Sequence, residues 1–465
     1  MWFLTAHACI QVSWDRPLST TPKRIVVLGG GFAGVTAASR LEKIWHDDQA
    51  VDVTIISSDN YLLFTPMLPE VPASSIEAKH IISPLRAFFR KVRFQVNEVQ
   101  SVDFDRRIVD VSHCPNCPAD EIPYDYLILA LGSTTNFFGL PGVAEHSFSM
   151  RTLSDAMILR NHVISLFEHA DLQKDSQTRR RMLTFVVAGG GFAGVETIAE
   201  LRDFARMARR YYPNIRPEEV RFVLVDRGSR IMSEISSDLG DYARKLLEKR
   251  GVEFHLETGV KAAAEDWIEL DNDQTIPTQT LIWTAGTSPN PLLRSFPCKR
   301  NKRGQVVVNE YLEVPGIDNV WALGDCAEIP DPFYSRRPHP PTAQHAIREG
   351  KAVAANVSGA IRGGEKSPFR YKPLGVLASI GRRSAVAEIL GFKFSGFFAW
   401  WLWRTLYLLK LPGFDRKVRV AIDWTLDLFF PRDIVLIKHL TRAALGESAR
   451  TERGAAPSPE METDA

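Results

Sequence analysis

The chain has 465 residues, of which 45% are hydrophobic and 24% are charged, and its formal net charge is +2. This length allows two or three domains, each with its own core. The near-neutral charge and the lack of a long basic run argue against a nucleic-acid partner. Five cysteines do not make a disulfide framework in a chain of this length, which favours a reducing compartment.

The first twenty residues begin with an apolar stretch but lack the basic region, long apolar core and cleavage site of a signal peptide. We expect residues 1–20 to form an N-terminal extension. No uncharged apolar run reaches the length of a membrane span, so no spanning helix is predicted.

One heptapeptide, Gly-Gly-Gly-Phe-Ala-Gly-Val, occurs twice, at residues 29–35 and 189–195. Each copy follows a short apolar run, residues 24–28 or 185–188, and opens a stretch with helical apolar spacing. The pattern predicts a buried parallel strand, a glycine turn and a helix, written twice. Such a turn brings backbone N–H groups and a helix N-terminus to a pyrophosphate. The sequence therefore predicts two bound nucleotides.

The strand that follows each turn should end in an acid that binds the adenosine ribose. In the second unit the strand at residues 221–225 ends in Asp226, which favours NADH over NADPH, although the adjacent Arg227 argues the other way. In the first unit the strand at residues 52–56 ends in Ser57 and Ser58 instead. The ribose contact of the first unit is therefore a departure from the pattern.

Further strand ends repeat the same plan. The apolar run at 126–132 ends in a glycine, and its counterpart at 281–286 ends in Ala-Gly at a matching distance after the second turn. A later strand, residues 319–323, ends in Gly324-Asp325. An acid after a glycine at a strand end can bind a polyol.

Several polar residues admit both a functional and a structural interpretation. Glu196 is expected in the first turn of the second helix, where an acid is often only a partner of the helix dipole. Gln344 and Arg348 are four residues apart and share a helix face, with His345 directed elsewhere. A solvated polar face is the alternative for that pair.

Three further sequence features lie between the N-terminal extension and the C-terminal stretch. Cys114 and Cys117 form a CxxC motif without a second Cys/His pair, so a surface hairpin loop is favoured over a zinc site or a redox pair. Residues 92–111 alternate in polarity and predict a hairpin or small sheet layer. A helix over 154–170, capped by Ser154, should lead into a charged linker at 171–181.

The C-terminal stretch changes in composition. Residues 396–410 are aromatic and apolar nearly all round but too short to span a bilayer, and residues 415–430 predict an amphipathic helix. Tryptophans and basic residues in this pattern favour binding at a membrane surface, with a dimer interface or a core helix pair as the alternatives. The polar tail is predicted to be disordered.

Over residues 23–438 the sequence resembles the type II NADH dehydrogenases, non-proton-pumping NADH:quinone oxidoreductases of the two-dinucleotide-binding-domain flavoprotein superfamily. The specific motifs are residues 63–71, residues 131–142, Ala343-Gln344 and the aromatic C-terminal helices. The resemblance implies an α/β fold with two Rossmann-like dinucleotide-binding domains, one for FAD and one for NADH, and an amphipathic helical membrane-binding region. The domains expected on this basis are an extension (1–20), the FAD-binding domain (21–150 and 289–365), the NADH-binding domain (151–288), a membrane-associated region (366–445) and a disordered tail (446–465).

The resemblance also implies roles for individual residues. Glu196 matches a glutamate beside the nicotinamide. Gln344 matches the first of two glutamines that flank the quinone, and Arg348 replaces the second; a guanidinium can donate to a quinone oxygen but cannot accept a hydrogen bond. These three residues form the expected catalytic set. The expected cofactor-binding residues are Gly29, Gly31, Phe32, Ala33, Gly34, Ser57, Ser58, Thr65, Pro66, Ala130, Gly132, Gly324, Asp325, Gln344, Gly189, Gly191, Gly194, Asp226, Ala285 and Gly286.

The expected partners are a quinone and the cytoplasmic face of the inner (plasma) membrane, with a homodimer as a further possibility. Related hypotheses remain open: a reductase of a specialised biosynthetic quinone, a sulfide:quinone reductase, a dithiol-disulfide reductase, or an apoptosis-inducing-factor-like protein that binds NADH for signalling. The sulfide and dithiol hypotheses require a cysteine pair beside the flavin. No cysteine lies between Gly34 and Ala87, and Cys298 and Cys326 fit no such pattern.

Overall fold

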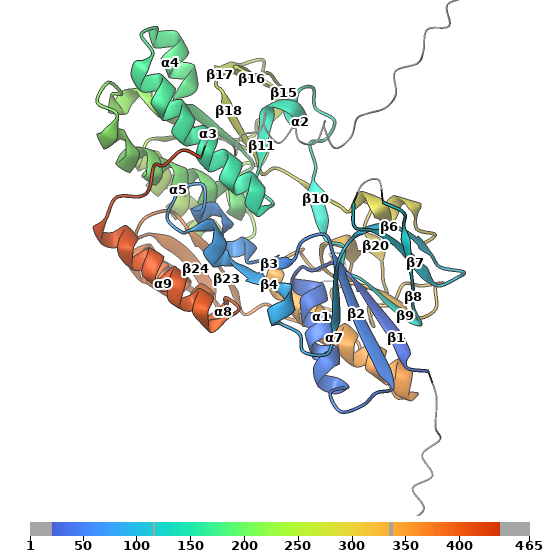
Figure 1. The fold of residues 1–465 in the computed structure, drawn as a ribbon. Coiled ribbons are helices and arrows are strands. Elements are labelled where there is room, and N and C mark those ends of the chain that lie inside the picture. The colour runs from blue at the N-terminus through green and yellow to red at the C-terminus, as the bar shows by residue number, and fades with distance from the viewer. Residues whose placement is uncertain (1–20, 115–116, 334–337, 438–465) are drawn as a thin grey trace, which may run out of the picture.

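A computed structural model of the chain describes residues 21–114, 117–333 and 338–437. The predicted N-terminal extension, the tail and the end of the predicted membrane-associated region lie outside this part. Figure 1 shows two lobes, each built on a parallel sheet, and a third layer formed by the last strands and helices.

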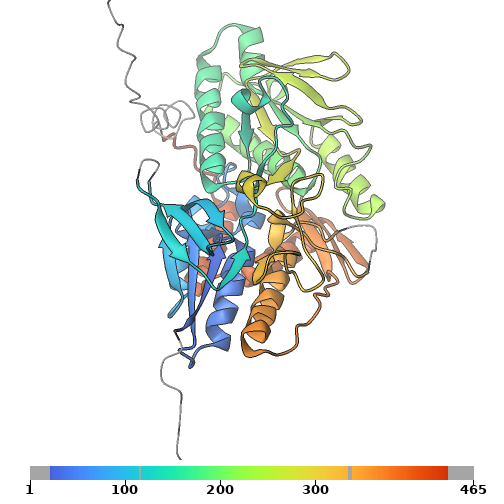
Figure 2. The same cartoon turned by 90° about the vertical axis from the view of Figure 1, so that its right-hand side faces the viewer.

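The first lobe is built on a five-stranded parallel sheet in the order β21-β9-β1-β2-β5. Its apolar runs are buried on both faces, as the sequence pattern predicts. The helices α1 and α7 pack closely together against this sheet, and Figure 2 shows them side by side in blue and orange. The elements are β1 (Lys23–Leu28), α1 (Phe32–Ile44), β2 (Val51–Ser57), β5 (Arg93–Val96), β9 (Tyr126–Leu129), β21 (Val320–Ala322) and α7 (Ala343–Arg362).

The second lobe repeats this arrangement with the parallel order β11-β18-β12-β13-β14. Its glycine turn joins β12 to α5, as the first turn joins β1 to α1. The elements are β11 (Ser147–Ser149), α3 (Leu153–Leu172), α4 (Ser176–Met182), β12 (Thr184–Ala188), α5 (Phe192–Ala208), β13 (Arg221–Val225), α6 (Ser237–Lys249), β14 (Val252–His255) and β18 (Thr280–Trp283).

The two lobes are linked by an antiparallel pair, β10 (Ser133–Thr135) with β19 (Thr287–Pro289). In Figure 1, β10 runs between the lobes. The smaller elements are β3 (Tyr61–Leu63), the 3₁₀ helix η1 (Thr65–Glu70), β4 (Ile82–Pro84), β6 (Glu98–Asp103), β7 (Ile108–Ser112), β8 (Asp120–Pro123), α2 (Val143–His146), β15 (Val260–Ala263), β16 (Trp267–Leu270), β17 (Thr275–Pro277), β20 (Val306–Val307) and β22 (Ala327–Glu328).

The C-terminal layer consists of the antiparallel sheet β23 (Gly375–Ser379), β24 (Ala385–Ile389) and β25 (Phe392–Ser395), followed by α8 (Gly396–Lys410) and α9 (Phe414–Phe429). Both helices contribute to an apolar cluster that also contains side chains of η1. No helix in the described ranges is long and apolar enough to cross a bilayer.

Two local predictions need correction. The cap of α3 is Thr152, not Ser154: its hydroxyl accepts from the Asp155 N–H at 3.0 Å, and the Asp155 carboxylate accepts from the Thr152 N–H at 2.8 Å. This reciprocal capping box satisfies two donors at once. The predicted linker at 171–181 contains the helix α4, which begins after the Asp175 cap.

The remaining local predictions hold in part. The pair β6–β7 is an antiparallel hairpin as expected, but β5 joins the parallel sheet of the first lobe. Cys114 and Cys117 lie in the connection from β7 to β8, as expected of a hairpin loop, and form a disulfide. This local bond is not a framework, but it gives no support to the predicted reducing compartment.

Candidate functional site

The first glycine turn leaves space at only one of its three motif positions. Gly29 has a φ of +114°, and a Cβ atom there would lie 2.1 Å from the Ala130 carbonyl oxygen. A Cβ at Gly34 would lie 2.0 Å from the Gly29 oxygen, whereas at Gly31 nothing lies within 4 Å. The outer glycines therefore serve the turn and the helix packing, and the middle one leaves the backbone open to a ligand.

The second turn has the same geometry. Gly189 has a φ of +115°, and a Cβ atom there would lie 2.6 Å from the Thr284 hydroxyl. A Cβ at Gly194 would lie 1.9 Å from the Gly189 oxygen, and again nothing lies within 4 Å of the middle position, Gly191. Both turns thus fit a pyrophosphate in the same way.

The residues at the two strand ends occupy equivalent places. The Asp226 carboxylate accepts from the Gly190 N–H and the Gly228 N–H, each at 2.6 Å. In the first lobe, a Cβ at Gly30 would lie 2.5 Å from the Ser57 hydroxyl oxygen, so this serine stands where the acid stands in the second lobe. Ser58 is exposed beside it. The two nucleotide sites differ at the residue expected to meet the ribose.

Asp325 is held by residues that sequence reasoning did not find. Its Oδ2 accepts from the Ser133 hydroxyl at 2.6 Å and from Arg151 Nη2 at 3.1 Å. The preceding Gly324 has a φ of +72° and donates its N–H to Glu349 Oε2 at 2.8 Å. Burial raises the pKa of Glu349 to about 8, so this carboxyl is largely neutral at pH 7. Arg151 and Glu349 have no motif of their own; only the fold brings them here.

Close packing of α7 on α1 brings Asp325 to the first turn. A Cβ at Gly350 would lie 2.6 Å from the Ala33 oxygen, and a Cβ at Gly324 would lie 3.3 Å from the Ala33 methyl carbon. Phe32 contacts Phe64 edge to face at 5.9 Å, immediately before η1. The other predicted cofactor residues line the same region or its counterpart in the second lobe: Thr65 (exposed), Pro66 (half-buried), Ala130 (buried), Gly132, Ala285 and Gly286.

Glu196 lies one turn further into α5 than predicted. The helix begins at Phe192, so Glu196 is not in the first turn and the helix-dipole interpretation loses its basis. Its side chain is buried, and Oε1 accepts from the Ser379 N–H of β23 at 2.9 Å. Burial, aided by the nearby Glu70 and Glu200, raises the pKa of Glu196 to about 8. This carboxyl therefore holds a proton at neutral pH.

A second buried acid, Glu70 on η1, is close enough to Glu196 to interact with it electrostatically. Glu70 accepts from the Trp424 indole N–H at 2.8 Å, which joins η1 to α9. Its burial and the proximity of Glu200 raise its pKa to about 8. Arg404 faces the ring of Trp424 at 4.7 Å and contributes a positive charge.

Arg432 forms ion pairs at the other end of this group of buried ionisable residues. Its guanidinium lies 3.1 Å from Glu200 and 2.7 Å from Asp427, and all three side chains are buried. Sequence patterns did not indicate this network, because its members come from η1, α5, α9 and the segment after α9.

Gln344 and Arg348 share one face of α7, as predicted, and Tyr371 lies between them. The Tyr371 hydroxyl donates to Gln344 Oε1 at 3.2 Å, and the Arg348 guanidinium lies 5.4 Å from the Tyr371 ring centroid. His345 is expected to be directed elsewhere, but its buried ring contacts the Tyr371 ring edge to face at 5.1 Å. Its Nδ1 lies 2.7 Å from the Thr342 hydroxyl. Arg348 itself is exposed, so its donors remain available.

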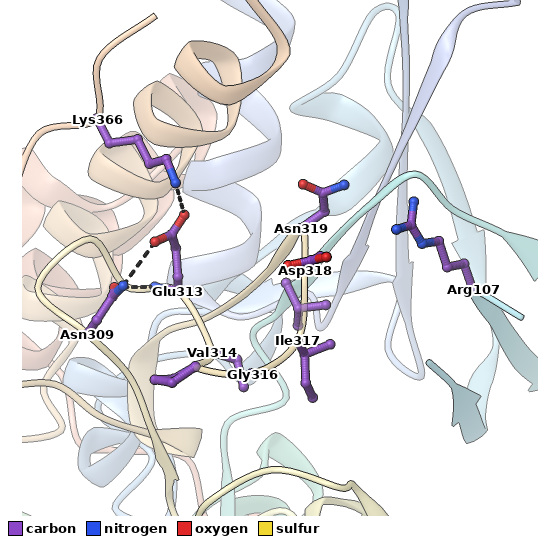
Figure 3. A pocket seen from close by; sticks show the side chains of 11 residues that line it. Arg107, Asn309, Glu313, Val314, Gly316, Ile317, Asp318, Asn319 and Lys366 are labelled. Carbon is purple, nitrogen blue, oxygen red and sulfur yellow. Dashed lines mark hydrogen bonds and ion pairs between the residues drawn. The ribbon is translucent and has the colours of Figure 1, made fainter. Parts of the chain in front are cut away.

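A cavity of about 370 Å³ lies between the 309–320 loops and Arg107 (Figure 3). Lys366 pairs with Glu313 at its edge. None of the predicted site residues lines it, so we assign it no part in the site.

The sequence pattern of the pyridine nucleotide-disulphide oxidoreductases matches residues 23–350, and that of the NDH2 C-terminal domain matches residues 374–433. The type II NADH:quinone oxidoreductase Ndh of Mycobacterium tuberculosis is 31% identical, over 90% of this chain and 91% of that protein. The chain belongs to the type II NADH dehydrogenase family. A probable NADH dehydrogenase of Dictyostelium discoideum is 30% identical, over 89% of this chain and 91% of that protein.

Among solved structures, NDH2 of Plasmodium falciparum in complex with NADH superposes with a TM-score of 0.83 at 21% identity, over 89% of this chain and all of that one. The predicted fold class is confirmed by this likeness and by the parallel sheets of both lobes. FAD and NADH are the cofactors of this type II NADH dehydrogenase family, and the two open glycine turns fit two dinucleotides.

The two free cysteines in the described part of the chain do not support a sulfide or dithiol reaction. Cys326 is fully buried, its thiol is directed at the Leu129 and Leu323 carbonyls, and burial raises its pKa to about 12. Such a thiol is a poor nucleophile. Cys298 is half-buried beside Arg300 and packs against the core of the first lobe.

Proposed function

We propose that this type II NADH dehydrogenase oxidises NADH and reduces a quinone at a membrane surface, with FAD in the first lobe and NADH in the second. Bound FAD would supply the redox chemistry, by taking a hydride from NADH and giving two electrons to the quinone. The observation that carries this assignment is the pair of identical turns, each with open space only at its middle glycine.

The strand ends distinguish the two nucleotides. Asp226 offers a carboxylate to the ribose of a dinucleotide at the second turn and repels a 2′-phosphate, which favours NADH over NADPH. The adjacent Arg227 is exposed, and its side chain lies against Gly259. Ser57 gives the first turn only a neutral contact.

Glu196 is our candidate for the residue that controls proton supply near the nicotinamide. The Ser379 N–H fixes one of its oxygens, and its raised pKa keeps a proton on the carboxyl at neutral pH. Quinone reduction consumes protons, so a buried carboxyl that holds one beside the site can provide it.

We place the quinone near Gln344 and Arg348. Tyr371 fixes the Gln344 amide, and the exposed Arg348 guanidinium can donate to a quinone oxygen and stabilise the reduced anion. Arg348 replaces the glutamine expected by family resemblance and gives this chain a charged donor at that position.

The membrane proposal rests on the direction in which α9 presents its faces. Two of its acids point inward: Asp423 contacts His80 at 2.5 Å, and Asp427 pairs with Arg432. Val420 and Trp424 are buried on the same side, whereas most of the other large apolar side chains of α9 point outward. The exposed large hydrophobic residues on α8, on α9 and after α9 are Phe397, Phe398, Trp401, Leu409, Phe414, Val418, Ile422, Leu426, Phe429, Phe430, Val435 and Ile437.

An apolar face of this size directed at solvent marks an interaction surface. The aromatic and basic side chains of both helices suit the membrane–water interface. The cytoplasmic side of the membrane and the homodimer stay predictions.

A reductase of a specialised biosynthetic quinone is the second candidate. The demethylphylloquinone reductase NdbB of Synechocystis is 31% identical, over 86% of this chain and 95% of that protein. The two functions differ in the quinone, not in the nucleotide sites.

The test is anaerobic reduction of the purified flavoprotein by NADH, followed by reoxidation with a panel of quinones. We expect rapid bleaching of the flavin by NADH and rapid reoxidation by one or more respiratory quinones. Fast reoxidation by a biosynthetic naphthoquinone alone would favour the second candidate. A long-lived reduced state with every quinone would contradict both.

A further inference from the structure

A cavity of about 330 Å³ lies on the C-terminal side of the second lobe, between α5, the end of α6 and the β23–β24 turn. Its lining is almost wholly basic and consists of Arg202, Asp203, Arg206, Arg250, Arg382 and Arg383. We call it the arginine pocket.

The charges of the arginine pocket are not balanced within it. Asp203 is its only acid, and this buried carboxylate accepts from Arg202 Nη1 at 2.9 Å and from the Arg382 backbone N–H at 2.6 Å. Arg250 Nη1 lies 4.0 Å away from it. One carboxylate therefore faces five guanidinium groups.

The other contacts of these arginines are mostly with neutral acceptors. Arg250 donates to the Ile380 carbonyl at 2.5 Å, and Arg202 Nε donates to the Arg250 carbonyl at 3.0 Å. Arg206 and Arg383 are exposed and form no ion pair within the described ranges. The Nε of Arg382 is buried and has no hydrogen-bond partner there. The pocket therefore has positive charge and donors in excess.

The arginine pocket adjoins the C-terminal end of α9. Arg382 Nη2 donates to the carbonyls of Asp427 and Leu428, in the last turn of that helix. The neighbouring Leu426 and Phe429 are 48% and 77% exposed. The helix α8 packs against β23 and β24, and α9 packs against α8. A ligand in the pocket would therefore sit at the edge of the surface that we assign to the membrane.

We propose that the arginine pocket binds the phosphate group of an acidic phospholipid. Guanidinium groups match phosphate oxygens in charge and in paired hydrogen-bond geometry, and a lipid places that phosphate at the edge of an apolar surface. This inference rests on the proposed membrane association. It adds to it a specific site, separate from the helices that enter the interface.

The test compares vesicle binding of the FAD-loaded full chain and of a double variant, Arg206→Gln/Arg383→Gln. Both side chains are exposed and form no ion pair among described residues, so their loss should leave the fold intact. The matched control, Arg294→Gln/Arg303→Gln, removes the same charge from exposed positions in the first lobe. Vesicles are made of phosphatidylcholine alone or with one part in four of phosphatidylglycerol.

We expect the wild type and the control to prefer the anionic vesicles, and the pocket variant to lose that preference by about fivefold for each arginine removed. Binding to neutral vesicles should be equal in all three. If the pocket variant and the control prefer anionic vesicles equally, the proposal that the arginine pocket binds a lipid phosphate is overturned. No binding to either vesicle by the wild type would instead contradict the membrane association itself.

Inorganic phosphate distinguishes a lipid from a soluble ligand. We expect phosphate to leave the thermal midpoint of the protein unchanged at concentrations of about 1 mM, because an isolated anion lacks the apolar anchor that the lipid supplies. Stabilisation by phosphate that is lost in the pocket variant, with unaltered vesicle preference, would show a site for a soluble phosphate compound and overturn the lipid assignment.

Discussion

The indole N–H of Trp424 donates to the carboxyl of Glu70 at 2.8 Å, and this buried bond joins the last helix of the chain to the 3₁₀ segment after β3. The Glu70 carboxyl lies in turn in the electrostatic field of Glu196. The helices that we propose face the membrane and the proposed hydride-transfer site thus share one buried cluster of ionisable groups.

Trp424→Phe tests this bond, because phenylalanine keeps an aromatic ring but loses the donor. A buried carboxyl without its partner should cost about 1–3 kcal/mol, seen as a lower thermal midpoint of the FAD-loaded protein. Trp401→Phe is the control, since Trp401 is 52% exposed. Equal midpoints for the two variants would show that the bond contributes nothing.

Gly31→Ala and Gly191→Ala form a matched pair that tests the nucleotide assignment. Both glycines have ordinary negative φ values and no protein atom within 4 Å of an added Cβ, so both variants should fold. We expect the first to lose FAD on purification. The second should keep FAD and raise the KM for NADH by about tenfold or more. The reverse pattern would show that FAD binds at the second turn and NADH at the first.

Glu196→Gln keeps the size of the side chain but removes the titrating proton. We expect kcat with quinone to fall by about tenfold or more, within the usual range for loss of a proton donor, while FAD content is unchanged. The activity of wild type should also decline as pH rises through about 8, and that step should vanish in the variant. Glu145→Gln, at an exposed position on α2, is the control. Unchanged turnover would exclude the role.

Glu349→Gln tests whether burial raises the pKa of Glu349 and keeps its carboxyl neutral. Burial raises the pKa of Glu349 to about 8 from its ordinary value of 4.5, so its stabilising contribution is complete below pH 4.5 and is lost as pH rises through 8. Each pH unit in this window should weaken the wild type by about 1.4 kcal/mol for this group. Thermal midpoints from pH 5 to 9 should therefore fall less steeply in the variant. Parallel curves would contradict the raised pKa.

Much of the fold follows from local patterns, and the site does so only in part. The glycine turns, the strand ends and the shared face of Gln344 and Arg348 depend on residues close in sequence, so their spacing predicts them. Arg151, Glu349 and Tyr371 act through contacts between elements far apart in the chain, and no local pattern marks them.

The helix α9 shows the same limit. Its sequence separates charged from apolar side chains, but the pattern does not say which side faces the protein. The half-buried His80 and the buried Arg432 decide this, because they give Asp423 and Asp427 their partners inside. Val420 and Trp424 are buried on the same side, and the row formed by Val418, Ile422, Leu426 and Phe429 is left exposed.

The most direct test of the account is NADH oxidation by vesicles that contain a long-chain quinone, with Ile422→Ser/Phe429→Ser compared with the wild type. Substitutions suit this test better than removal of α9, which would also remove Trp424 and Asp427 from the core. Leu172→Ser, at a residue 79% exposed on α3, is the control.

We predict that the α9 variant loses most of its activity with the membrane quinone but keeps its activity with a water-soluble short-chain quinone. The control should keep both. Full activity of the α9 variant with the membrane quinone would contradict the claim that electrons leave this protein at a membrane surface.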